Sequence, residues 1–123
     1  MNTVALVLAG FVALEHVGFM ILEMQFWNKP LGLKVFRRTQ AEQDATFSLA
    51  KNQGLYNGFL AAGLVWGLFT PTPLGQPLRM FFLGCVVLAG IVGAVTANPR
   101  ILLVQGLPAL AGLVATLLSM NVG

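Results

Sequence analysis

Charged residues are scarce in this sequence. Only 9% of the 123 residues are charged, against about 25% in an ordinary soluble domain, and 57% are hydrophobic. Four long stretches carry no charge at all, namely residues 1–14, 52–78, 80–99 and 101–123. A helix crosses a bilayer with about 20 mostly apolar residues, and three of the stretches reach that length. The composition therefore excludes a soluble globular protein.

Cysteine and histidine each occur once, as Cys85 and His16. A single cysteine excludes a disulfide framework and predicts a packing residue. His16 has no second histidine, and Glu15 and Glu23 do not lie three or four positions from it, so we expect neither a metal site nor a cofactor. A basic leader is also lacking at the N-terminus, so the first apolar stretch is interpreted as a membrane span and not as a cleaved signal peptide.

The few positive charges are concentrated in one segment. The formal net charge is +3, and most of the basic residues are Lys29, Lys34, Arg37, Arg38 and Lys51. Basic loops stay on the cytoplasmic side, so we expect a multi-pass protein of the bacterial inner membrane with both termini outside. The basic loop either sets this topology alone or also attracts anionic lipid headgroups. The lipid bilayer is the expected partner, and so small an excess charge excludes a nucleic-acid binder.

Helix signals divide the chain into four apolar helices. Pro30 ends the first, and Gly32 favours a turn after it. Thr39 and Glu42 form a capping box at the start of the second, and Pro108 should kink the fourth. The prolines between residues 71 and 77 predict a tight external turn. The expected fold class is all-α, a polytopic membrane protein with a four-transmembrane-helix bundle. It forms a single domain over residues 1–123, with helices at about 3–27, 40–69, 78–97 and 99–120.

Small residues recur four positions apart in these helices. This spacing lets helix backbones approach closely in lipid and predicts tight packing. It does not say whether the partner helix lies in the same chain, so a homo-oligomer stays an option. The pairs are Gly54 with Gly58, Gly90 with Ala94, Gly93 with Ala97, and Ala111 with Ala115.

Ionisable residues inside the first helix are the strongest functional signal. An ionisable group costs about 2.5–3.5 kcal/mol at the centre of a membrane helix, so such groups should face the protein interior. By depth, the second helix brings amides and a tyrosine to the same cytoplasmic half. The predicted ligand-binding or proton site is Glu15, His16, Glu23, Asn52, Gln53, Tyr56 and Asn57. Further lining is expected from Lys51, Asn98, Arg100 and Gln105.

Three functions are compatible with this site. The leading hypothesis is binding or transport of an unknown small molecule, with proton coupling through Glu15 or Glu23 as an option. The alternative is an intramembrane enzyme acting on a lipophilic or thiol-conjugated substrate, with Glu23 or His16 as base and Tyr56 as acid. In the third, the polar groups only bridge helices, and the protein is structural or accessory. The sequence identifies no catalytic residue with certainty.

Two segments carry a resemblance to a known family. The chain resembles the Domain of Unknown Function 1304 family, small bacterial proteins expected to have four membrane helices. The likeness implies this architecture, and that the acids of the first helix and the amide-rich segment are the family's hallmark, but it implies no activity. The matching residues are Leu14-Glu15-His16, Leu22-Glu23-Met24, Trp27, Lys29-Pro30 and the segment Asn52-Gln53-Gly54-Leu55-Tyr56-Asn57-Gly58 with its continuation to Leu64.

Two weaker likenesses concern function. In size and expected topology the chain is similar to the membrane-associated eicosanoid and glutathione metabolism proteins, with Lys51-Asn52-Gln53 at the place of their polar second-helix segment. It lacks their arginine-rich pattern there. Ala13-Leu14-Glu15 is similar to the first helix of small multidrug resistance transporters, in which one glutamate exchanges protons.

Overall fold

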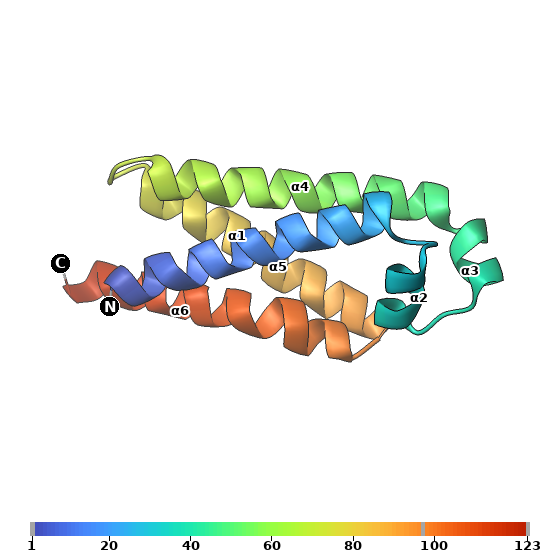
Figure 1. Ribbon diagram of the computed structural model, residues 1–123. Coiled ribbons are helices and arrows are strands. Elements are labelled where there is room, and N and C mark those ends of the chain that lie inside the picture. Colours follow the sequence, from blue (N-terminus) through green and yellow to red (C-terminus); the bar gives the residue numbers. More distant parts are fainter. Residues whose placement is uncertain (1, 97, 123) are drawn as a thin grey trace. The chain divides into compact units, whose positions relative to one another are not determined.

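The computed structural model describes residues 2–96 and 98–122, and these ranges contain helices and turns without a strand. The all-α class is thereby confirmed. Figure 1 shows the elements in chain order, with the short helices α2 and α3 between the long α1 and α4. The elements are α1 (Asn2–Gln25), α2 (Pro30–Phe36), α3 (Gln40–Ala45), α4 (Phe47–Phe69), α5 (Gly75–Thr96), the π-helical turn η1 (Leu102–Gly106) and α6 (Leu107–Val122).

The chain divides into two compact units. Unit 1 comprises Met1–Leu14 and Leu60–Gly123, and unit 2 comprises Glu15–Phe59. Helices α1 and α4 each contribute one half to each unit. The expectation of a single domain stays a prediction.

Three helical segments of the described chain are long and apolar enough to cross a membrane. They are Asn2–Gln25, Gly75–Thr96 and Leu102–Met120. Large apolar side chains are exposed on all three, as on Leu14, Val95 and Leu103. Such exposed surface is typical of a protein whose surroundings are lipid. Helix α4 is not among the three, since its first half carries the amides of the expected second span.

Small and branched side chains form the core of unit 1. Ala9 and Val12 of α1, Leu64 of α4 and Val86 of α5 are fully buried there, with Ala109 of α6. Glycines bring the backbones close together. A Cβ atom on Gly90 of α5 would lie 2.9 Å from Gly106 Cα in η1. The expected packing role of Gly90 is confirmed, whereas the expected end of this helix at Ala97 lies outside the described residues.

Arg79 connects the start of α5 to the C-terminal end of α4. Its side chain is only 4% exposed, and its Nη1 donates a hydrogen bond of 2.8 Å to the carbonyl oxygen of Gly67. The carbonyls of a helix's last turn lack partners within the helix, so a buried guanidinium stabilises this end of α4. Helix α5 begins at Gly75, before the expected Leu78, because Pro77 is tolerated in a first turn.

A π-helical turn interrupts the last predicted helix. Over residues 102–106 the backbone widens, and the N–H of Leu107 donates to the carbonyl of Leu102, five residues earlier. Pro108 follows directly. Because proline has no N–H, the carbonyl of Val104 loses the donor that an α-helix would supply. The backbone hydrogen bonds just before Pro108 therefore span five residues and not four. The sequence predicted a kink in one helix, and the structure has the π-helical turn η1 followed directly by α6.

In unit 2, α2 replaces the turn that the sequence predicted. Pro30 occupies its first turn, where its missing N–H is not needed, and Arg37 ends it with φ 54°. Gly32 lies inside this helix and not in a turn. A Cβ atom there would lie 2.0 Å from the carbonyl oxygen of Phe26, so only glycine allows α2 to approach the end of α1.

The helix expected over residues 40–69 is two helices, α3 and α4. The capping box is confirmed: Thr39 Oγ1 accepts from the N–H of Glu42, whose side chain accepts from the N–H of Thr39. Thr46 separates the two helices. Its hydroxyl donates to the carbonyl of Glu42 at 2.8 Å and accepts from the indole N–H of Trp27 at 3.0 Å. This side-chain competition for a helical carbonyl interrupts the regular turn.

Candidate functional site in unit 2

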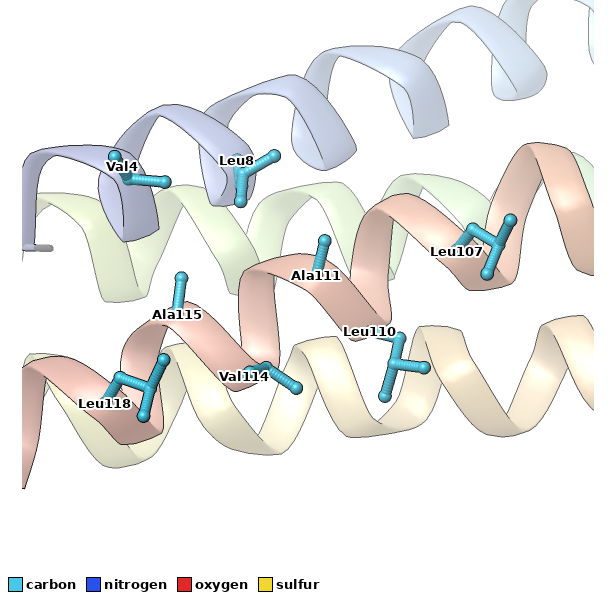
Figure 2. Close-up of a pocket in the computed structure, with 8 residues that line it drawn as sticks. All are labelled: Val4, Leu8, Leu107, Leu110, Ala111, Val114, Ala115 and Leu118. Carbon is cyan, nitrogen blue, oxygen red and sulfur yellow. The ribbon is translucent and has the colours of Figure 1, made fainter.

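An apolar groove lies in unit 1, apart from the predicted polar residues. Figure 2 shows it between the N-terminal part of α1 and the face of α6 that carries alanines. Its volume is about 460 Å³, and every lining side chain is aliphatic: Val4, Leu8, Leu107, Leu110, Ala111, Val114, Ala115 and Leu118. The groove offers no polar group to orient a ligand, so the candidate site lies elsewhere.

Glu23 and Asn57 form the centre of the candidate site. Asn57 Nδ2 of α4 donates a hydrogen bond to Glu23 Oε1 of α1. Asn57 is 5% exposed and Glu23 is half-buried. An amide donor stabilises a carboxylate without neutralising its charge. The pair is thus the point at which the predicted acid of the first helix and the predicted amides of the second meet.

Two glycines of α4 bring α1 within reach of Asn57. A Cβ atom on Gly54 would lie 2.6 Å from Met24 Cγ and 3.2 Å from both Glu23 Cβ and the Met20 carbonyl oxygen. One on Gly58 would lie 2.7 Å from Met20 Sδ. The predicted packing role of both glycines is confirmed. Because close approach holds at two successive turns, the Glu23–Asn57 contact is set by the backbones.

Glu15 and His16 lie two turns along α1 from Glu23. His16 is fully buried, and its ring meets Phe19 edge-on at 5.2 Å. Glu15 is half-buried, and its Oε1 is covered without a hydrogen-bond partner in the described chain. A buried carboxylate oxygen without a donor has an open capacity for a proton, a water molecule or a ligand donor.

The remaining predicted residues of α4 are exposed. Asn52, Gln53 and Tyr56 lie on the outer side of the helix, and Tyr56 is 53% exposed with its ring 6.0 Å from that of Phe59. In the described part of unit 2 no side-chain hydrogen bond joins them to the Glu23–Asn57 pair, so their role in the site stays a prediction. On a helix, positions 53 and 56 point away from 54 and 58, so the close glycine contact turns them outward.

The additional lining residues have separate environments. Lys51 lies over the ring of Phe47, with its Nζ 4.3 Å from the ring centroid. Asn98 caps its own turn, with its Oδ1 accepting from the N–H of Arg100 at 2.9 Å. Gln105 is buried within η1. Asn98, Arg100 and Gln105 belong to unit 1, so their expected role at this site stays a prediction.

Gln43 is a buried polar residue of unit 2 that the sequence did not single out. It is fully buried in α3, and its Nε2 donates to the Trp27 carbonyl at 2.8 Å. Its Oε1 has no partner in the described chain. Its position directly after Glu42 made it resemble an ordinary exposed helix residue, so no local pattern could have revealed it.

The acids of α1 in unit 2, Glu15 and Glu23, form no ion pair with a lysine or arginine in the described part of that unit. In α3, hydrogen bonds from the Thr39 backbone and hydroxyl lower the pKa of Glu42, and the nearby charge of Arg38 adds to this effect. No group of three metal-ligating His, Cys, Asp or Glu residues occurs in the described ranges.

Comparison with known proteins gives a family and one curated relative. The chain is 29% identical over 118 residues to the uncharacterised protein YpaA of Lactococcus lactis subsp. lactis (strain IL1403), covering 94% of this chain and 98% of that protein. No solved structure gives a significant match. A model of the family described as "Protein of unknown function (DUF1304)" matches residues 10–117. This match spans most of the chain, which therefore belongs to the DUF1304 family.

Proposed function

We propose that this chain is a multi-pass protein of the bacterial inner membrane that binds or transports a small molecule, with a proton exchanged at Glu23. In this proposal α4 also crosses the membrane, as the second of four spans in chain order, and both termini lie outside. The three apolar segments support the membrane location, and the basic residues between Lys29 and Lys51 support the cytoplasmic side for α2 and α3.

The observation that carries the proposal is the Glu23–Asn57 hydrogen bond inside unit 2. A carboxylate within an apolar membrane helix costs free energy. Because its hydrogen-bond partner is a neutral amide, the negative charge of Glu23 is not cancelled and can attract a proton or a cation. A purely structural bridge between helices needs no ionisable group, since two amides would serve. An acid in this place is therefore better explained by exchange of a proton or binding of a cation.

The charges in unit 2 favour a cationic ligand. Glu15 and Glu23 lie on one helix without a lysine or arginine partner in that unit, and Glu15 Oε1 lacks a donor. A cation of lipophilic character fits an acid in apolar surroundings, and it would displace a proton from the carboxyl group. The enzyme alternative gains no comparable support, because Tyr56 is exposed beside Phe59.

The test uses the purified full-length protein in neutral detergent and tetraphenylphosphonium as a lipophilic cation probe. We expect saturable binding with release of protons, followed with an indicator dye in weakly buffered solution. Glu23→Gln should weaken binding about tenfold or more and abolish the proton release, because the charge is removed. In vesicles, an imposed pH gradient should drive uptake of the probe if binding is part of transport.

Glu42→Gln is the matched control, since it removes an exposed acid of the same unit. It should retain both binding and proton release. Equal binding by the wild type and Glu23→Gln would contradict the proposal and favour a structural role for the pair.

A further inference from the structure

The short helix α2 has an exposed apolar edge, and exposed cations lie in and beside the helix. Leu31 and Val35 are both 47% exposed and lie four positions apart, hence on the same side of the helix. Four basic residues in and beside the helix are exposed as well, namely Lys29, Lys34, Arg37 and Arg38. We name Leu31, Val35 and these four residues the α2 surface.

Contacts with the end of α1 fix where this surface lies. Helix α1 ends at Gln25 and α2 begins at Pro30, so the α2 surface directly follows an apolar segment long enough to cross a membrane. Phe36 packs on Trp27, with ring centroids 4.6 Å apart, and Gly32 lies against the carbonyls of Phe26 and Trp27. Helix α2 is thereby held against the end of this apolar segment.

In the described residues, the acids Asp44 and Glu42 of unit 2 are held by uncharged partners and not by ion pairs with the α2 surface. Asp44 Oδ1 accepts hydrogen bonds of 3.0 Å from Asn28 and Gln40. Glu42 is engaged by Thr39 in the capping box. Within the described residues of unit 2 no ion pair joins either acid to the α2 surface, although the charge of Arg38 lies near Glu42. Most of the positive charge therefore remains open to an outside anion.

We propose that the α2 surface binds anionic phospholipids of the cytoplasmic leaflet. Leu31 and Val35 enter the edge of the hydrocarbon, and the four cations engage phosphate groups of the surrounding lipids. Basic residues beside an apolar helix face are the recognised chemistry for an anionic membrane surface. This inference goes beyond the proposed function, because it uses no residue of the Glu23–Asn57 site.

Lipid selectivity provides the first test. The full-length protein is reconstituted in phosphatidylcholine, and the lipid associated with it is measured by electron spin resonance with spin-labelled phosphatidylglycerol or phosphatidylcholine. We expect a preference for phosphatidylglycerol that falls as salt is raised. The double variant Lys34→Gln/Arg38→Gln should lower this preference about fivefold for each cation removed at low salt.

The matched control, Lys51→Gln/Arg100→Gln, removes two cations that lie outside the α2 surface, and it should retain the preference. An equal preference in the wild type and the α2 double variant would overturn the proposal. Displacement of phosphatidylglycerol by soluble pyrophosphate at constant ionic strength would also overturn it, because the anion would then be a free phosphate compound and not a lipid.

Depth provides a second, independent test. In a Cys85→Ala background, Leu31→Cys and Ala41→Cys are each labelled with a fluorophore, and quenching by brominated acyl chains is measured. The label at position 31 should be quenched and the label at position 41, on exposed α3, should not. Absence of quenching at position 31 would show that the surface does not reach the bilayer and would overturn the proposal even if every variant folds.

Discussion

At the scale of single residues, the space around each glycine decides its role. A Cβ atom on Gly32 would meet two backbone carbonyl oxygens, whereas one on Gly18 would meet nothing within 4 Å. Both residues are helical members of unit 2. The sequence pattern does not separate them, because the difference lies in what another segment places opposite the glycine.

Gly32→Ala should destabilise unit 2 by about 3 kcal/mol, because the backbone atoms of Phe26 and Trp27 cannot move aside as a flexible side chain can. The matched Gly18→Ala should raise stability by about 0.5–1 kcal/mol, since alanine restricts the unfolded chain and finds open space. Denaturation of the purified protein, followed by circular dichroism, measures both changes. Equal stability of the two variants would contradict the contact described for Gly32.

The lowered pKa of Glu42 predicts that the stability supplied by the capping box of α3 depends on pH. Hydrogen bonds from Thr39 lower the pKa of Glu42 below its ordinary value of 4.5, so the folded state binds this proton less readily than the unfolded state does. The stabilisation is therefore complete above about pH 4.5 and is lost as the pH falls through the lowered folded-state pKa. Unfolding curves from pH 6 to pH 3 should show this loss in the wild type and a smaller one in Glu42→Gln.

At the scale of elements, the helix interruptions have local chemical causes. Thr46 bonds to the carbonyl of Glu42 and to the indole of Trp27 where α3 gives way to α4. Pro108 removes a backbone donor where η1 gives way to α6. The capping box and the disruptive proline were visible in the sequence. The helix α2 was not, because Gly32 is tolerated there only through its contact with the end of α1.

Arg79→Met should loosen the joint between α4 and α5. The substitution keeps a long apolar stem but removes the charge-assisted hydrogen bond to the Gly67 carbonyl, a loss of about 2 kcal/mol. Arg100→Met, at an exposed arginine of the same unit, should change the stability by less than about 0.5 kcal/mol. Thermal unfolding in detergent compares the two variants. A joint stabilised mainly by packing would give the same melting temperature for both.

At the scale of the whole molecule, the exposed surface is more apolar than that of a soluble protein. Side chains such as Phe69 and Val95 are more than 80% exposed, and three segments are long enough to cross a membrane. Scarcity of charge and this outward apolar surface are two aspects of one adaptation, since lipid removes the need for a polar exterior.

The proposed topology predicts which loops face each side. In a Cys85→Ala background, Leu74 is replaced by cysteine, at an exposed position between α4 and α5. This cysteine should react with a membrane-impermeant maleimide added to spheroplasts. A cysteine at exposed Ala41 should react only after the membrane is opened, because the basic segment stays in the cytoplasm. The opposite labelling pattern would reverse the topology, and labelling of both from outside would contradict a fourth span.

Much of the candidate site could be anticipated and some of it could not. Depth along the helices correctly paired Glu23 with the amides of the second helix, and Asn57 is its partner. Depth does not fix rotation about the helix axis, so Asn52, Gln53 and Tyr56 were expected inward and lie exposed. Gln43 escaped notice because its burial depends on Trp27, which lies 16 residues earlier in the chain.

The sequence by itself determined the all-α class, the apolar segments, the capping box and the acids within the first helix, because each depends on composition or on neighbours within one turn. The tertiary structure decided that Gly32 belongs to a helix, that Thr46 divides one expected helix and η1 begins another, and that Asn57 is the amide that donates a hydrogen bond to Glu23 in the described part of unit 2. These features depend on which backbone lies opposite a residue, and that contact is made between segments that the linear sequence keeps apart.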